Sequence, residues 1–253
     1  MSLPAAIHNV KYKVATIALV VLTPPISTSM AKASPPTYLY DVRLVQAAPG
    51  RLLELIDLYK ARMPAYQASG DEPPFWMRHS QGDRWDLMLL FPMSSYAEYY
   101  QRDRIERRKK ADAGSERIDQ CIAWQEDVFA YGPPLADLKK AFDGAGFFHV
   151  EMFQSLAGKQ AELYKEREME NAYLRTLKQP ENLIFVRDRG AAWDNFTIGF
   201  YRDLKHYAEG TDASTKQQEE AARAAGFEDA RHIGPYLRTL ISAHHDTLAV
   251  AIK

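Results

Sequence analysis

The sequence predicts an α+β fold in which two similar units pack sheet against sheet within one chain. Three observations lead to this prediction: a Gly-x-x-Trp-Asp motif that occurs twice, an ungapped internal match at a fixed offset, and one order of predicted elements in both halves. The chain has 253 residues, of which 46% are hydrophobic and 26% charged, and these are ordinary values for a globular protein. This length suits one large domain or two of ordinary size.

The motif reads GDRWD at 82–86 and GAAWD at 190–194. A shift of 108 residues superimposes the two copies and aligns further identical residues without a gap. The aligned pairs are Val42 with Val150, Gln46 with Gln154, Gly50 with Gly158, Glu54 with Glu162, Leu55 with Leu163, and Tyr99 with Tyr207. We therefore interpret the chain as a tandem duplication. In each motif we expect Trp to pack between the sheets and Asp to accept N–H groups of the hairpin turn.

The first unit, 38–131, has the pattern of four strands and two helices. Runs rich in β-branched and aromatic residues predict strands, and apolar residues at helical spacing predict helices. The predicted strands are 38–45, 74–80, 84–91 and 122–132, and the predicted helices are 49–67 and 94–110. A tight Gln-Gly-Asp turn joins the two middle strands as a hairpin. The order is β-α-β-β-α-β, which is that of a ferredoxin-like unit.

The second unit, 146–253, repeats this order after a linker at 132–145 that holds a short helical pattern. Its predicted strands are 146–153, 182–188, 192–201 and 243–253, and its first helix is 157–178. A helical region at 203–225 is interrupted by Gly210, and a short extra helical stretch falls within 228–241. Two such units are expected to pack as an intrachain α/β barrel.

Residues 1–33 have the order of a secretory signal peptide. Lys11 and Lys13 precede an apolar stretch at 14–22, and small residues end at Ala33, after which we expect cleavage. This predicts a periplasmic or secreted protein; the alternative is a mis-assigned start and a cytoplasmic location. The apolar stretch is too short to cross a bilayer as a helix, and no other segment is apolar enough, so we predict no stable membrane span.

Composition and motifs argue against several classes of protein. The net charge of −1 argues against a dedicated nucleic-acid binder. Cys121 is the only cysteine, which excludes an intramolecular disulfide and a cysteine-based zinc site. The sequence has no Walker loop, dinucleotide fingerprint, His-Glu-x-x-His or Gly-x-Ser-x-Gly motif, so nucleotide and ordinary hydrolase chemistry are disfavoured.

The segment YDVRLVQAAPGRLLELIDLY at 40–59 resembles the opening of a NIPSNAP-type domain of the dimeric α/β-barrel superfamily. The second copy departs from it, with Ala157-Gly158 in place of Pro49-Gly50 and Glu151 in place of Arg43. The superfamily includes cofactor-free monooxygenases, haem enzymes and members without an assigned activity. The resemblance therefore implies the fold more strongly than the chemistry.

Alternation along the strands sorts side chains onto two faces. Two strands each have one apolar face, formed by Tyr40, Val42 and Leu44 and by Phe148, Val150 and Met152, and we expect helices to cover these faces. The opposite faces have four ionisable residues, Asp41, Arg43, His149 and Glu151. We expect these four, with the polar face of Trp193, Asn195 and Thr197, to line a pocket between the two sheets. Because His244 and His245 alternate, one of them must face this pocket.

The candidate catalytic residues are His149, as a general acid or base, and Glu151, which would orient it. The candidate substrate contacts are Asp41, Arg43, Trp193, Asn195, Thr197 and His245. Two other interpretations stay open. His149, Glu151 and one histidine of the pair could bind a metal ion as two histidines and a carboxylate, or the ionisable groups could only pair with one another between the sheets.

These observations predict a protein that binds an apolar or aromatic small molecule between its sheets, as a cofactor-independent monooxygenase-like or proton-transfer enzyme. The alternative is a non-catalytic ligand-binding or interaction protein. No cofactor is favoured, and haem or a metal ion stays open. Because the duplication would supply both halves of a barrel, we expect a monomer or a homodimer.

Overall fold

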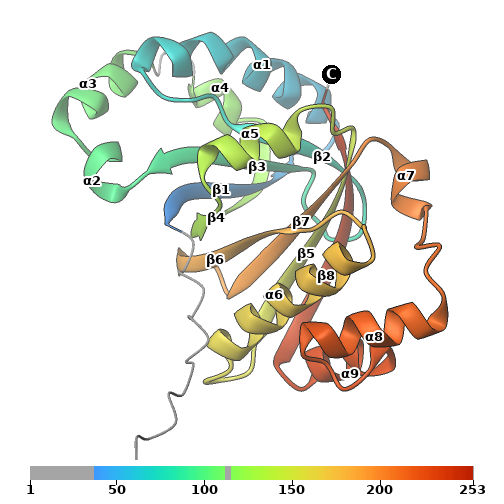
Figure 1. Cartoon of the computed structure of the whole chain (residues 1–253). Helices are drawn as coiled ribbons and strands as arrows, with labels where there is room; N and C mark the ends of the chain where they lie inside the picture. Colours follow the sequence, from blue (N-terminus) through green and yellow to red (C-terminus); the bar gives the residue numbers. More distant parts are fainter. Residues whose placement is uncertain (1–36, 112–114, 253) are drawn as a thin grey trace, which may run out of the picture. The chain divides into compact units, whose positions relative to one another are not determined.

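The computed structural model describes residues 37–111 and 115–252 (Figure 1). The predicted signal peptide, 1–33, lies outside these residues. Within the described ranges eight strands form a closed antiparallel barrel in the order β1-β3-β2-β8-β5-β7-β6-β4. No helix in the same ranges is long and apolar enough to cross a membrane.

The elements of the first half follow the predicted order. They are β1 (Tyr38–Ala47), α1 (Leu52–Ser69), β2 (Phe75–Gln81), β3 (Leu87–Ser94), α2 (Tyr96–Tyr99), α3 (Arg102–Ala111), α4 (Ser115–Asp119) and β4 (Ile122–Gly132). The helix predicted at 94–110 is split into α2 and α3, and α4 was not predicted. Ser95 caps α2, because its hydroxyl accepts a hydrogen bond from the Glu98 N–H.

The second half begins after α5 (Leu135–Phe142), which occupies the predicted linker. Its elements are β5 (Phe147–Ser155), α6 (Gln160–Thr176), β6 (Leu183–Gly190), β7 (Asn195–Tyr201), α7 (Leu204–Ala208), α8 (Thr215–Ala225), the 3₁₀ turn η1 (Ala230–His232), α9 (Ile233–Arg238) and β8 (Ile241–Ala251). The predicted interruption at Gly210 is confirmed, since it lies between α7 and α8. The short helical stretch predicted within 228–241 is η1 with α9.

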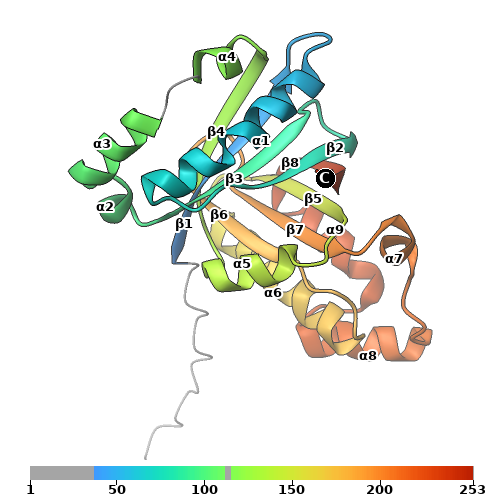
Figure 2. The ribbon, with the colours of Figure 1, turned by 90° about the horizontal axis from the view of Figure 1, so that it is seen from above.

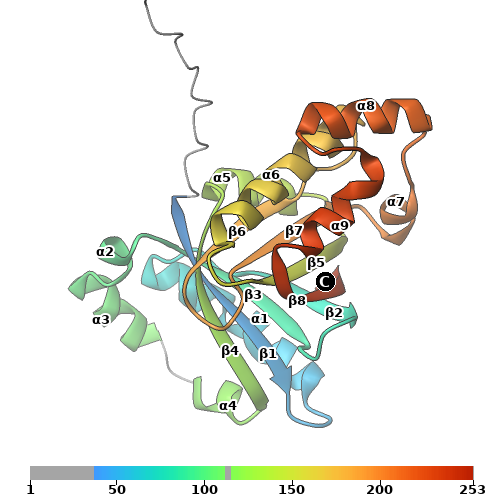
Figure 3. The same ribbon diagram turned by 90° about the horizontal axis from the view of Figure 1, so that it is seen from below.

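Two seams close the ring of strands. The strands of the first half lie in the order β4-β1-β3-β2 and those of the second half in the order β8-β5-β7-β6. β2 then pairs with β8, and β4 pairs with β6, so each seam joins the two halves. Figures 2 and 3 show α1 to α4 on one side of the barrel and α6, α8 and α9 on the other.

The barrel interior is a packed apolar core to which all eight strands contribute. It contains Tyr40, Val42, Leu44, Met77, Met88, Leu90, Val128, Ala130, Phe148, Val150, Met152, Phe185, Phe196, Ile198 and Ala249. The assignment of faces from the sequence was therefore wrong: the apolar faces of β1 and β5 point into the barrel, and the ionisable faces point outward, toward the helices. The reason is that the interior of an eight-stranded barrel is only wide enough for side chains, so it takes the apolar set.

The glycines of the two Gly-x-x-Trp-Asp motifs lie where each hairpin meets the other half of the barrel. Gly82 has a φ of +124°, and a Cβ atom there would come within 2.2 Å of the Asp246 carbonyl oxygen in β8. Gly190 has a φ of +110°, and a Cβ atom there would come within 2.4 Å of the Asp127 carbonyl oxygen in β4. Both glycines are required by backbone conformation and by the close contact at a seam.

Helix α5 closes one end of the barrel. Leu138 is fully buried in the interior core, and Phe142 packs against rings from β2, β5 and β7. The ring centroids of Phe142 and Phe148 are 5.2 Å apart. The segment that joins the two halves is thus part of the core and not a free tether.

Candidate functional site

The outward-facing ionisable residues form two separate clusters. In the ring of eight strands β1 and β5 stand four places apart, so their outer faces point to opposite sides of the barrel. Asp41 and Arg43 of β1 lie beside α1, and Glu151 of β5 lies beside Arg167 of α6. The four predicted residues therefore do not meet in one pocket between sheets, and the inter-sheet space is filled by the apolar core.

The first cluster opens into a cavity of about 370 Å³ between α1, the outer face of β1 and the segment that contains α2 to α4. Its lining includes Asp41, Arg43, Tyr59, Tyr66, Phe91 and Tyr99. The sequence interpretation identified Asp41 and Arg43 but missed the three tyrosines. The spacing of Tyr59 and Tyr66 could have found two of them, because residues seven apart share a helix face.

Asp41 is largely buried in this cavity, and its negative charge is only partly compensated by neighbouring groups. Its side chain is 15% exposed, and its Oδ1 atom has no hydrogen-bond partner among the described residues. The Nη2 atom of Arg43 lies 3.9 Å from its Oδ2 atom. Burial raises the pKa of Asp41 to about 6, although Arg43 opposes this effect. The carboxyl group therefore changes its protonation state close to neutral pH.

Arg43 is held in place beside Asp41. Its Nε atom donates a hydrogen bond of 2.7 Å to Asp127 Oδ1, and its guanidinium carbon lies 5.3 Å from the ring centroid of Phe91. The hydroxyl of Tyr59 is buried and has no hydrogen-bond partner in the described part of the chain. Burial also raises the pKa of Tyr66 to about 12. The cavity thus combines aromatic walls, three cationic side chains (Arg43, Arg62 and Arg108), and buried polar atoms of Asp41 and Tyr59 without a hydrogen-bond partner among the residues described.

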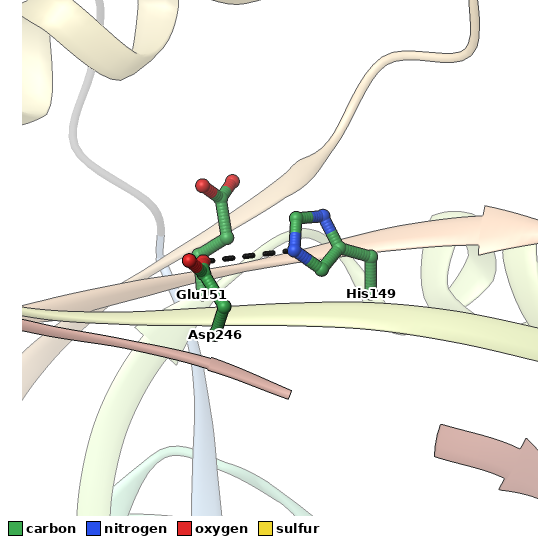
Figure 4. Close-up of side chains that lie close together, drawn as sticks. All are labelled: His149, Glu151 and Asp246. Atoms are coloured by element: carbon green, nitrogen blue, oxygen red, sulfur yellow. Dashed lines mark ion pairs between the residues drawn. The ribbon is translucent and has the colours of Figure 1, made fainter. Parts of the chain in front are cut away.

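The second cluster lies on the outer face of the β5–β8 ladder (Figure 4). His149 and Glu151 come from β5, and Asp246 of β8 stands opposite Glu151. The Nε2 atom of His149 is 3.6 Å from Asp246 Oδ1. His244 is the histidine that joins them: its Nε2 atom is 2.9 Å from Asp246 Oδ1 and 3.8 Å from Glu151 Oε1. Contact with Asp246, and then with Glu151, raises the pKa of His244 to about 9.

Helix α6 lies beside the second cluster and adds further charged residues to it. Arg167 is buried and contacts three carboxylates, those of Glu151, Glu166 and Glu170. Thr197 donates a hydrogen bond of 3.1 Å from its hydroxyl to Glu151 Oε2. Burial raises the pKa of Glu170 to about 7, against the effect of Arg167. This is a connected charged network, and the predicted pair of His149 and Glu151 lies at its outer end.

The other residues predicted to contact a substrate lie on two different faces of the barrel wall. Asn195 and Thr197 are buried and share a face with Glu151, as predicted, but this face points outward and does not line a space between two sheets. Trp193 and His245 lie on the other side of the barrel wall. The chain bends between Trp193 and β7, and the side chain of His245 alternates with those of its neighbours along β8. The ring centroids of Trp193 and His245 are 4.7 Å apart, the Trp193 Nε1–H donates a 3.0 Å hydrogen bond to Glu126, and His245 Nδ1 lies 2.9 Å from an Asp83 carboxylate oxygen.

Comparison with known proteins shows structural similarity in the fold alone. No family model matches the chain, and no curated protein matches it. Among solved structures, an anthrone oxidase-like protein is 11% identical with a TM-score of 0.54, covering 86% of this chain and 92% of that chain. An inferred monooxygenase from Fusobacterium nucleatum subsp. nucleatum is 8% identical with a TM-score of 0.52, covering 86% of this chain and 94% of that chain. The chain therefore shares its α+β fold with these two structures.

Proposed function

We propose that the chain binds a small aromatic molecule with a weakly acidic proton in the cavity between α1 and β1, and that Asp41 accepts this proton. The observation that carries the proposal is the Oδ1 atom of Asp41, which is buried in a cavity and has no partner among the described residues. A buried polar atom without a partner is costly unless a ligand or water meets it.

The size and lining of the cavity support an aromatic ligand. A volume of about 370 Å³ lies within the range of small-molecule sites. The rings of Tyr66, Phe91 and Tyr99 provide apolar walls, and the Tyr59 hydroxyl offers a hydrogen bond. Such a site favours a flat molecule with one polar edge directed at Asp41 and Arg43.

The electrostatics support proton transfer at Asp41. With a pKa of about 6 the carboxyl group is largely ionised at pH 7 and remains a stronger base than an ordinary aspartate. The proton would move from the ligand to Oδ1 and leave an anion on the ligand. Arg43, fixed by Asp127, would stabilise that anion.

Proton abstraction at a benzylic CH2 group can lead to oxygenation without a cofactor. The carbanion would transfer electrons to dioxygen, so that CH2 and O2 give C=O and H2O. The shared fold with an anthrone oxidase-like protein and an inferred monooxygenase supports this reaction class. The catalytic roles of His149 and Glu151 stay predictions, and neither residue lines this cavity.

We also infer that the two halves are ferredoxin-like units that arose by duplication. The matching strand orders of the halves support this. So do the hydrogen bonds of Asp86 and Asp194, which recur at the 108-residue offset. The NIPSNAP-type resemblance and the export of the protein after removal of 1–33 stay part of this proposal.

The test uses anthrone as the probe, with binding measured by calorimetry and turnover by absorbance and oxygen uptake. We expect Asp41→Asn to keep binding within a few-fold and to lose turnover by at least a hundredfold, and Phe91→Ala to weaken binding. His149→Ala separates this proposal from the predicted catalytic role of His149: the proposal expects it to leave both unchanged, because His149 does not line the cavity, and a catalytic His149 would lose turnover. Full turnover in Asp41→Asn would overturn the proposal, and binding without turnover in the wild type would favour the non-catalytic alternative.

A further inference from the structure

We propose that His149, Glu151 and Asp246 form a binding site for one divalent first-row transition-metal ion on the outer face of the β5–β8 ladder. This site is independent of the function proposed above, because the cavity of Asp41 lies beside β1, on the opposite side of the barrel. Each of the three residues offers one ligand atom from a strand, so the backbone ladder fixes their spacing.

The three side chains converge on one point. His149 and Glu151 are two residues apart on β5 and therefore share its face, and Asp246 is the direct partner of Glu151 across the ladder. One ligand atom from each of the three lies within 4.8 Å of the others (Figure 4). Ligands at about 2.1 Å from an ion are at most about 4.2 Å apart, so small side-chain rotations suffice to close the site.

Neighbouring residues already orient the two carboxylates. The hydroxyl of Thr197 and the guanidinium of Arg167 both contact Oε2 of Glu151, at 3.1 and 3.7 Å, whereas Oε1 is approached by His244 Nε2 at 3.8 Å, so an ion would bind at Oε1 beside that imidazole. His244 contacts Oδ1 of Asp246 at 2.9 Å and holds that carboxylate in place. Supporting contacts of this kind are typical of metal sites.

The local charge favours a bound cation. Four carboxylates belong to this network: Glu151, Glu166, Glu170 and Asp246. Apart from His149, which is neutral when it binds a metal, the cationic groups that contact the network among the described residues are Arg167, Arg238 and protonated His244; Arg238 approaches His244 at 3.4 Å. The carboxylates outnumber these groups, and Glu166 is fully buried. Buried carboxylates need compensation by positive charge.

The donor set identifies the class of ion. One imidazole nitrogen with two carboxylates suits Mn²⁺, Fe²⁺ or Zn²⁺ better than Mg²⁺ or Ca²⁺, which prefer oxygen ligands alone. Cys121 cannot contribute a thiolate, because it is buried in the core under α1. Asp246 has 53% of its side chain exposed, so water can reach the open coordination positions.

The test titrates the full chain, freed of metal by a chelator, with Mn²⁺ followed by electron paramagnetic resonance and with Zn²⁺ followed by calorimetry. We expect one ion per chain for each metal. His149→Ala and Asp246→Asn should each weaken binding at least tenfold. His245→Ala is the matched control, since His245 is adjacent in sequence but lies on the opposite face, and it should bind as the wild type does.

A second measurement separates loss of the site from loss of the fold. Saturating Zn²⁺ should raise the Tm of the wild type and of His245→Ala, and it should not raise that of Asp246→Asn. Asp246 is partly exposed, so this variant should keep the circular dichroism spectrum of the wild type. Absence of one-to-one binding in the wild type, unchanged binding in both ligand variants, or equal weakening in His245→Ala would each overturn the proposal.

Discussion

The Oδ2 atom of Asp86 accepts a hydrogen bond of 2.8 Å from the backbone N–H of Ala47, and this contact ties the start of β3 to the end of β1. The same contact recurs in the second half, where Asp194 Oδ2 accepts from the N–H of Ser155 at 2.8 Å. The aspartate of each Gly-x-x-Trp-Asp motif thus accepts a backbone N–H, as the sequence predicted. Its donor, however, belongs to the neighbouring strand and not to the hairpin turn.

The two aspartates should differ in their contribution to stability. Asp194 is buried, also accepts a 2.7 Å hydrogen bond from the Ser155 hydroxyl, and pairs with Arg187. We expect Asp194→Asn to lower the free energy of unfolding by about 2 kcal/mol and Asp86→Asn to lower it by about 1 kcal/mol. Urea denaturation at pH 7 measures both values, and equal losses would contradict the prediction.

The effect at Asp194 should also depend on pH. Although burial opposes them, the contacts with Ser155 and Arg187 lower the pKa of Asp194 below its ordinary value of 3.8. A carboxyl whose pKa is depressed in the folded state contributes stability above the pKa of the unfolded state, and this contribution is lost as the pH falls through the folded-state value. The difference between wild type and Asp194→Asn should therefore shrink below pH 4.

The contribution of Asp41 to stability should depend on pH in the opposite direction to that of Asp194. Its pKa is raised to about 6 in the folded state, so ionisation of this group costs free energy when the chain is folded. The cost is absent below the unfolded-state pKa near 4, grows as the pH rises, and is complete above about pH 6. We expect Asp41→Asn to be more stable than the wild type by about 2–3 kcal/mol at pH 7.5 and equally stable near pH 4.

Thermal unfolding across this pH range tests the prediction for Asp41. Asp119→Asn is a suitable control, because Asp119 lines the same cavity but is exposed at its rim. It should leave stability unchanged at both pH values. A loss of stability in Asp41→Asn at pH 7.5 would show that the carboxylate is fully compensated in the fold, which would also weaken its assignment as a base.

Arg167 should be among the most sensitive positions of the chain. It is buried with Glu166 and also contacts Glu170, so its removal leaves carboxylates without a counter-charge. We expect Arg167→Ala to lower the free energy of unfolding by about 3–5 kcal/mol. On the same helix Arg175 pairs with Glu181 at the surface, and Arg175→Ala should cost less than about 1 kcal/mol. Chemical denaturation of both variants compares them directly, and similar losses would refute the prediction.

The positions of strands and helices could be predicted from the sequence because they depend on local patterns. The strand predicted at 74–80 is Phe75–Gln81, and the helical pattern at 135–142 is α5. Alternation also placed Glu151 and Thr197 on one face correctly. These features follow from the period of the backbone, which is the same wherever the strand lies.

Local sequence patterns could not decide which face of a strand points into the barrel. Both faces of each strand are covered, one by helices and one by the opposite wall of the barrel, so an apolar face fits either position. The pairing of Asp246 with Glu151 depends on the register between β5 and β8, which local patterns do not contain. The cavity around Asp41 depends on where α1 and the segment after β3 lie over the sheet, and this is set by tertiary packing.

The closed ring has a consequence for association between copies of this chain. Each described strand has a strand neighbour on both sides, but the two seams cover only part of β8 and of β4. β2 pairs with β8 over Leu248–Ala251, and β6 pairs with β4 over Val128–Tyr131, so residues 241–247 and 122–127 pair with a strand on one side only. These two stretches are where a strand of another polypeptide could add by backbone hydrogen bonds, and elsewhere on the barrel self-association depends on side-chain complementarity.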